Sequence, residues 1–191
     1  MKKFLSALLV VLMLASLSVC AFAANPSPTQ NKDKADATIV EAEKDEAKAA
    51  KAVKESAAKD EDGEEAVAAI GALPADATDE MKADFEDLAD ALVDAKDALA
   101  AGDAAIPADI KADAAEGATV SASQPFRAVA SSYPATITIS VENPDDFVGM
   151  IVFMNGKWVK LNTVVNDDGT VTFVLDEPAV LSIVSQVAKA A

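Results

Sequence analysis

The sequence contains no histidine, one cysteine and few positively charged residues, and each scarcity excludes a class of function. Without a histidine among its 191 residues, the chain has no imidazole to act as a general base or to bind a metal ion. Lys and Arg number 16 against 32 Asp and Glu, which gives a formal net charge of -16. Nucleic-acid binding depends on cationic side chains that neutralise phosphates, so we expect no nucleic-acid partner.

The first 23 residues have the layout of a secretory signal peptide. Lys2 and Lys3 precede an apolar run over residues 4–19, and this order is typical of exported proteins. The cleavage pattern of small residues consists of Ala21, Ala23 and Ala24. A membrane anchor is the competing interpretation, but the run is shorter than the roughly 20 residues that span a bilayer. We therefore expect cleavage after Ala23 and no integral membrane segment in the mature chain.

The only cysteine, Cys20, leaves a second route of processing open. A cysteine at the end of such a run can become the lipid-bearing first residue of a lipoprotein, although Val19 stands where those signals usually carry a smaller residue. Cleavage after Ala23 removes Cys20 together with Lys2 and Lys3, so the mature chain has no disulfide and a net charge of -18. Both routes predict a secreted, extracellular protein, either free or associated with the cell surface.

The chain divides into two parts of different composition. Residues 24–119 contain 30 Ala, 25 Asp and Glu, and 10 Lys, a mixture of strong helix formers with little apolar mass. We divide this part into a flexible leader over residues 24–35 and an acidic helical region over residues 36–116. A linker over residues 117–134 then precedes a β-module over residues 135–187.

Periodic apolar residues predict one long helix in the acidic region. They recur at three- and four-residue steps as Met81, Phe85, Leu88, Leu92 and Leu99. Thr78 is a good N-cap, so we expect a helix over residues 79–101. Shorter helices are expected over residues 64–72 and after Pro107. Residues 37–59, rich in Ala, Glu and Lys, form either a helix packed on the apolar stripe or a frayed, mobile arm.

The second part has the alternating pattern of strands. Ile137, Ile139 and Val141 alternate with small polar residues, which is typical of a strand with one buried face. Four further short runs follow, over residues 147–154, 158–165, 171–175 and 180–185. Five strands at this spacing predict a small antiparallel β-sandwich or open barrel, so the expected fold class is α+β.

A two-residue hairpin turn at Asn155-Gly156 sorts the neighbouring side chains onto two faces. One face carries only apolar residues: Val148, Met150, Val152, Met154, Val159 and Leu161. The other face carries the candidate binding residues, which are Ile151, Phe153, Trp158 and Lys160, together with Asn162. Left uncovered, this aromatic face suits sugar rings or a peptide strand. The alternative is that a loop or helix covers it as part of the core.

Clusters of carboxylates predict neither a metal site nor a catalytic site. Residues 60–65 are acidic around Gly63, but they lack the alternating ligand positions of a calcium-binding EF-hand loop. We interpret them as a turn between helices. Asp145 and Asp146 are adjacent, which gives no opposed acid–base geometry. Because the Ser and Thr residues have no activating base beside them, we expect a noncatalytic protein without metal or cofactor.

A resemblance to a group of known proteins is carried by residues 134–139, 155–158 and 168–173 and by the apolar strand after Pro178. These stretches resemble the small β-modules near the C-termini of secreted and wall-attached proteins of Gram-positive bacteria, and residues 69–74 are similar to their Ala-rich helical spacers. The resemblance implies a noncatalytic surface protein whose β-module contacts a cell-wall glycan or an extracellular protein. The alternative is an accessory subunit of a larger secreted assembly, with the acidic helices as its contact surface.

Overall fold

Residues 32–187 are the part of the chain that the computed structural model describes. The expected signal peptide, with Cys20, Ala21, Ala23 and Ala24, lies outside the described residues, as does the leader up to residue 31. Within residues 32–187, no helix has the length and apolar character needed to cross a membrane.

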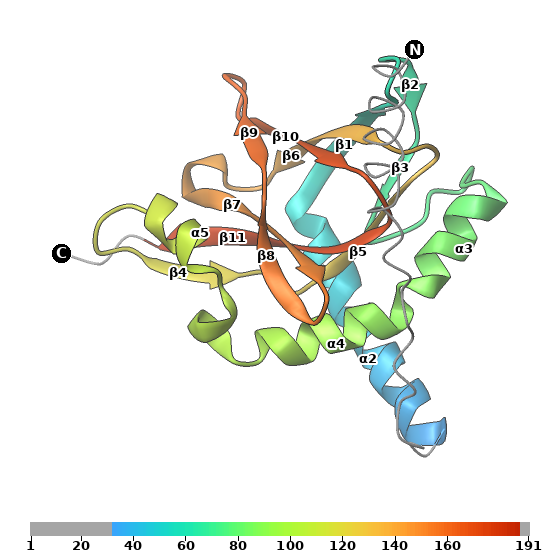
Figure 1. Cartoon of the computed structure of the whole chain (residues 1–191), viewed down its shortest axis with the longest axis horizontal. Helices are drawn as coiled ribbons and strands as arrows, with labels where there is room; N and C mark the ends of the chain where they lie inside the picture. Colours follow the sequence, from blue (N-terminus) through green and yellow to red (C-terminus); the bar gives the residue numbers. More distant parts are fainter. Residues whose placement is uncertain (1–31, 188–191) are drawn as a thin grey trace, which may run out of the picture. The chain divides into compact units, whose positions relative to one another are not determined.

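Two antiparallel sheets face each other in this part of the chain (Figure 1). Sheet 1 contains, in spatial order, β2 (Glu65–Ala66), β1 (Val53–Lys59), β6 (Ala135–Val141), β10 (Thr170–Leu175) and β9 (Thr163–Val165). Sheet 2 contains β3 (Ala68–Ile70), β5 (Phe126–Ala130), β11 (Ala179–Val187), β7 (Phe147–Met154) and β8 (Lys157–Leu161), and β4 (Thr119–Ala122) pairs with β11.

The chain passes from one sheet to the other at both edges. Only Val67 separates β2 of sheet 1 from β3 of sheet 2, and only Asn162 separates β8 of sheet 2 from β9 of sheet 1. In Figure 1, β8 and β9 accordingly follow one another in the orange part of the ribbon. The expected α+β class with a small antiparallel β-sandwich is confirmed.

Alternating side chains along the strands fill the space between the sheets. In sheet 1, Ile137 and Ile139 of β6 and Phe173 of β10 are buried, whereas the residues between them are partly or fully exposed. In sheet 2, Phe126 of β5 and Leu181 of β11 are buried in the same cluster. Removing this apolar area from water, at about 25 cal/mol per Å², stabilises the sandwich.

A layer of helices covers the outer face of sheet 2. The helices are α2 (Lys32–Ala49), α3 (Asp79–Asp87), α4 (Ala89–Leu99) and α5 (Ala108–Asp113), and 3₁₀ turns lie at η1 (Ala50–Ala52), η2 (Gly102–Ala105) and η3 (Pro144–Asp146). Leu92 of α4 and Ile110 of α5 pack with Val180 and Val184 of β11. Because β11 alternates, Leu181 on its opposite face belongs to the core between the sheets.

The helix expected over residues 79–101 is present as two consecutive helices. α3 and α4 meet at Leu88 and together span residues 79–99. The Thr78 hydroxyl oxygen accepts a hydrogen bond from the Met81 amide at 3.1 Å, which confirms the predicted N-cap. The predicted helix after Pro107 is confirmed as α5. α2 packs on α4, so the first half of residues 37–59 is a docked helix.

Two stretches expected to be helical are strands. β1 occupies the second half of residues 37–59, and β2 and β3 occupy most of residues 64–72. β1 pairs along β6, where Ala58 is buried opposite Ile137. Strand hydrogen bonds and burial outweigh a helix propensity of only about 0.7 kcal/mol per residue or less. The expected linker over residues 117–134 likewise contains β4 and β5, because both strands pair with β11.

Candidate binding groove

The β7–β8 hairpin has the register that its turn predicts. Asn155 and Gly156 have φ angles of 51° and 74°, a left-handed conformation that asparagine and glycine tolerate best. Phe153 lies opposite Trp158, and the other cross-strand partners follow in the expected order. The division of the hairpin into two faces is therefore confirmed from Met150 to Leu161. The assignment of Val148 to the apolar core face is wrong, because the register shifts between Val184 and Ser185 and Val148 packs against the helix-side cluster.

Helices cover the aromatic face of this hairpin. Ile151 is fully buried and Trp158 is 7 % exposed, and both belong to one cluster with Leu92 of α4 and Ile110 of α5. Phe153 is half-buried against this cluster, with its ring centre 5.3 Å from that of Trp158. The outer face of sheet 2 is apolar and requires a cover, so the covered alternative is the one observed. Ile151 and Phe153 do not form an open binding surface.

Lys160, the fourth candidate binding residue, attaches the hairpin to α5. Its Nζ donates a hydrogen bond to the Asp113 carboxylate. This hydrogen bond, with the added charge of Asp109, raises the pKa of Lys160. Lys160 therefore links β8 to α5, and its ammonium group is already paired with the Asp113 carboxylate.

The apolar face of the hairpin is buried only in part. Met150 and Val152 of β7 lie in the core between the sheets. Met154 and Val159 were also expected in the core, yet they are 45 % and 46 % exposed. Both lie close to the turn, and β8 is the edge strand of sheet 2, so the sandwich covers less of them.

Trp158 lines a groove of about 510 Å³ between the hairpin turn and the helices. The other lining residues are Ala98 of α4, Ala104 and Ala105 of η2, Ile106, Pro107, Ala108 and Lys111 of α5 and its approach, and Gly156 and Lys157 of the hairpin. We call this site the Trp158 groove. The hairpin tip packs beside α4, as Figure 1 shows. The volume falls within the roughly 300–1,000 Å³ of ligand sites.

The charged and side-chain polar groups of the Trp158 groove are hydrogen-bond donors. Neither Lys111 nor Lys157 takes part in an ion pair within the described part of the chain. The Trp158 indole nitrogen is buried and has no hydrogen-bond acceptor among the described residues. An indole N–H only donates, and leaving such a group unpaired costs about 1–3 kcal/mol. The lining thus brings two ammonium groups together with small apolar residues, and the unpaired indole N–H belongs to a lining residue but is itself buried.

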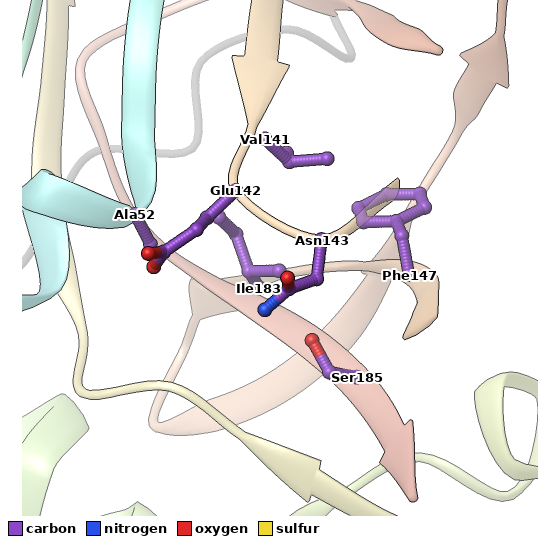
Figure 2. Close-up of a pocket in the computed structure, with 7 residues that line it drawn as sticks. All are labelled: Ala52, Val141, Glu142, Asn143, Phe147, Ile183 and Ser185. Carbon is purple, nitrogen blue, oxygen red and sulfur yellow. The ribbon is translucent and has the colours of Figure 1, made fainter. Parts of the chain in front are cut away.

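A second pocket, of about 80 Å³, lies at one end of the sandwich. It is lined by Ala52, Val141, Glu142, Asn143, Phe147, Ile183 and Ser185. Figure 2 shows the Asn143 amide and the Ser185 hydroxyl turned toward one another, while the Glu142 carboxylate points to the side of Ala52. The volume suits a few water molecules, and a single carboxylate provides neither an acid–base pair nor a cation site.

Acidic residues in two turns accept hydrogen bonds that stabilise those turns. Residues 60–65 form the turn between β1 and β2, not between helices as expected, and Asp60 accepts a hydrogen bond from the Glu64 amide at 2.9 Å. Asp168 accepts hydrogen bonds from the hydroxyl and amide of Thr170, which lower the pKa of Asp168. Within residues 32–187, no group of three His, Cys, Asp or Glu side chains is placed to hold a metal ion.

A buried ion pair that the sequence analysis missed joins α2 to β5. Arg127 is 5 % exposed and Glu46 is 1 % exposed. Arg127 donates to the Glu46 carboxylate through Nε and NH2 at 2.7 to 3.1 Å, and its guanidinium lies 3.8 Å from the centre of the Phe85 ring. The sequence does mark Arg127 as unusual, because it is the only charged residue within residues 117–141. The pair is enclosed, so its role is to attach α2.

Comparisons with known proteins identify no relative. No family model, curated protein or solved structure matches the chain.

Proposed function

We propose that this chain is an exported, noncatalytic binding protein and that the Trp158 groove binds a component of the cell envelope. The pattern of Lys2, Lys3 and the apolar run before Ala24 supports export. The resemblance of the β-module to wall-attached proteins supports an envelope partner. The binding site proposed here is the Trp158 groove and not the aromatic face of the hairpin, because helices cover that face.

The observation that carries the proposal is the composition of the groove. Four of its ten lining residues are alanine, which leaves room for a ligand. Among the described residues, Lys111 and Lys157 have no ion-pair partner and the buried indole N–H of Trp158 has no acceptor. Ligand sites typically combine apolar walls with a few placed polar groups. The pocket shown in Figure 2 also combines apolar and polar residues, but its volume of about 80 Å³ is far below the roughly 300–1,000 Å³ of ligand sites.

The scaffold holds the two sides of the groove together. The hairpin side is fixed by Trp158, which packs in one cluster with Phe153 and Leu92, whereas the partly exposed ion pair of Lys160 with Asp113 adds little. The helix side is anchored by Ile110 of α5, whose side chain is fully buried in the cluster between the helices and sheet 2. A site on packed elements requires little ordering when a ligand binds, which favours affinity.

Sedimentation with purified Gram-positive cell walls tests the proposal on the full mature chain. Ala108→Phe fills the groove, because Ala108 is an exposed lining residue at the start of α5. Ala83→Phe is the matched control, since Ala83 is an exposed residue of α3 that does not line the groove. Surface substitutions of this kind change stability by about 0.5 kcal/mol or less.

The proposal predicts that the wild type and Ala83→Phe sediment with the walls and that Ala108→Phe stays in solution. The proposal is wrong if the wild type does not sediment, or if all three proteins sediment equally. Thermal unfolding of each protein verifies that the comparison is made between folded chains.

A further inference from the structure

We propose that the Trp158 groove binds a carboxylate group attached to a compact apolar body. The inference rests on the proposed function and deepens it by naming the chemistry of the ligand. The evidence is the sign of the charges that line the groove, the unpaired indole N–H and the small size of the wall residues.

The lining of the groove is cationic in a strongly acidic chain. Lys111 and Lys157 are its only charged lining residues, and no Asp or Glu is among the described residues that line it. The whole sequence holds 32 acidic residues against 16 basic ones, so a lining with two lysines and no carboxylate has the opposite sign to the chain as a whole. Two positive charges with no ion-pair partner favour an anionic ligand.

The indole N–H adds a donor that the folded chain does not satisfy. Trp158 lies opposite Phe153 and is held in one cluster with Leu92, yet its Nε1 has no acceptor among the described residues. A carboxylate offers about four acceptor positions on two oxygens. It can accept from an ammonium group and, once the lining shifts to expose the buried Nε1, from the indole at the same time, and charge-assisted bonds of this kind are short and strong.

The small apolar residues that line the groove indicate which kind of group the ligand carries beside its carboxylate. Ala98, Ala104, Ala105 and Ala108 present methyl groups, and Ile106, which is buried, adds a small apolar surface. An apolar body gains about 25 cal/mol for each Å² of apolar surface that it removes from water. A phosphate ion fits less well, because it has no apolar surface to place against these methyl groups.

Two sources carry this chemistry: a small free acid and the C-terminal residue of a peptide. Benzoate represents the first, and N-acetylleucine represents the second because its amide and carboxylate reproduce a chain end. Benzamide and N-acetylleucinamide are the matched neutral ligands. Inorganic phosphate is added as a separate anion.

The indole N–H resonance of the mature protein gives a direct readout, because Trp158 is the only tryptophan in the chain. In a proton–nitrogen NMR titration, hydrogen bonding to a carboxylate should move this proton resonance downfield in a saturable way. The proposal predicts this movement with benzoate, N-acetylleucine or both, and none with the two neutral amides. Which acid binds more tightly distinguishes the free acid from the peptide end.

Lysine variants separate local charge from net charge. Lys111→Ala combined with Lys157→Ala should weaken carboxylate binding about tenfold or more, since both positive charges that line the groove are removed. Lys51→Ala combined with Lys59→Ala removes the same charge from exposed positions outside the groove and should leave binding within about twofold.

The proposal is overturned if neither acid moves the indole resonance, if the neutral amides move it equally, or if only phosphate does. Sedimentation with cell walls then shows whether only the ligand class is wrong or the proposed function is wrong as well. If the walls still bind the wild type but not Ala108→Phe, only the ligand class is wrong. If the walls bind neither protein, the proposed function is wrong as well.

Discussion

Gly71 shows how a single residue constrains the packing of this fold. Its φ is +67°, and a Cβ built on it would lie 2.3 Å from the Cβ of Ala50. Its amide donates to the carbonyl oxygen of Arg127 at 2.7 Å. Only glycine combines this backbone conformation with this close approach between the end of β3 and η1.

Gly71→Ala should therefore destabilise the protein more than Gly63→Ala does. Both glycines have positive φ, but a Cβ on Gly63 would have nothing within 4 Å. The left-handed conformation costs about 1–2 kcal/mol for either alanine, and overpacking adds about 1–3 kcal/mol at Gly71 alone. Urea unfolding of the two variants measures the difference. Equal losses of stability in Gly71→Ala and Gly63→Ala would contradict this prediction, because they would mean that η1 shifts away from the new Cβ with no loss of unfolding free energy.

Tyr133 is the only tyrosine, so its titration can be followed without ambiguity. Burial raises the pKa of Tyr133 from 10.0 to about 12, although the hydrogen bond from the Ala130 amide acts in the opposite direction. Because the folded pKa exceeds the unfolded one, the resulting stability is complete below pH 10 and is lost as the pH rises from 10 to about 12.

Ultraviolet absorbance of the phenolate should give a midpoint near 12 in the folded protein. The free energy of unfolding should fall across the same range, and Tyr133→Phe should lack this part of the pH dependence. A midpoint near the ordinary value of 10 would contradict the buried position of the phenol.

At the level of elements, α2 depends on one polar contact more than on apolar packing. Among its described side chains, those that are buried are Ala42, Glu46 and Ala49. Two alanines bury little apolar area, whereas the Glu46 carboxylate receives the guanidinium and the backbone amide of Arg127. Arg127 also donates to the Phe85 carbonyl oxygen at 3.1 Å, so the pair fixes α2 against both β5 and α3.

Glu46→Ala should cost about 3–5 kcal/mol of unfolding free energy, because it leaves the buried Arg127 guanidinium with only the longer contact, at 3.4 Å, to the exposed carboxylate of Glu43. Asp45→Ala is the matched control on the same helix, since its ion pair with Lys96 is partly exposed and such pairs contribute about 1 kcal/mol or less. Chemical unfolding measures both, and hydrogen exchange should show faster opening of α2 in Glu46→Ala. Similar losses in the two variants would contradict the anchoring role.

The elements also show how far the sequence predicts this fold. The turn at Asn155-Gly156 and the stripe from Met81 to Leu99 were predictable, because local φ preference and helical period determine them. β1 was not predictable, because residues 53–59 resemble a helix and become a strand only when β6 lies beside them. The cover over Trp158 also depends on residues distant in sequence, so the groove at its edge could not be located from the hairpin alone.

For the whole molecule, the acidic composition and the N-terminal pattern predict an exported and highly charged product. Intact-mass analysis of native protein, after the medium is separated from the cells, should find a chain that begins at Ala24. Loss of Lys2 and Lys3 then gives a net charge of -18. A chain that keeps Met1 inside the cells would contradict export, whereas a lipid-modified chain beginning at Cys20 would place the protein on the cell surface.

The emission of Trp158 during titration with soluble cell-wall fragments tests the central claim most directly. The single tryptophan lines the groove, so a ligand there must alter its surroundings. The account predicts a saturable change in emission for the wild type and for Ala83→Phe, and no such change for Ala108→Phe. Emission that remains constant in all three proteins at every fragment concentration would contradict the assignment of the Trp158 groove as the binding site.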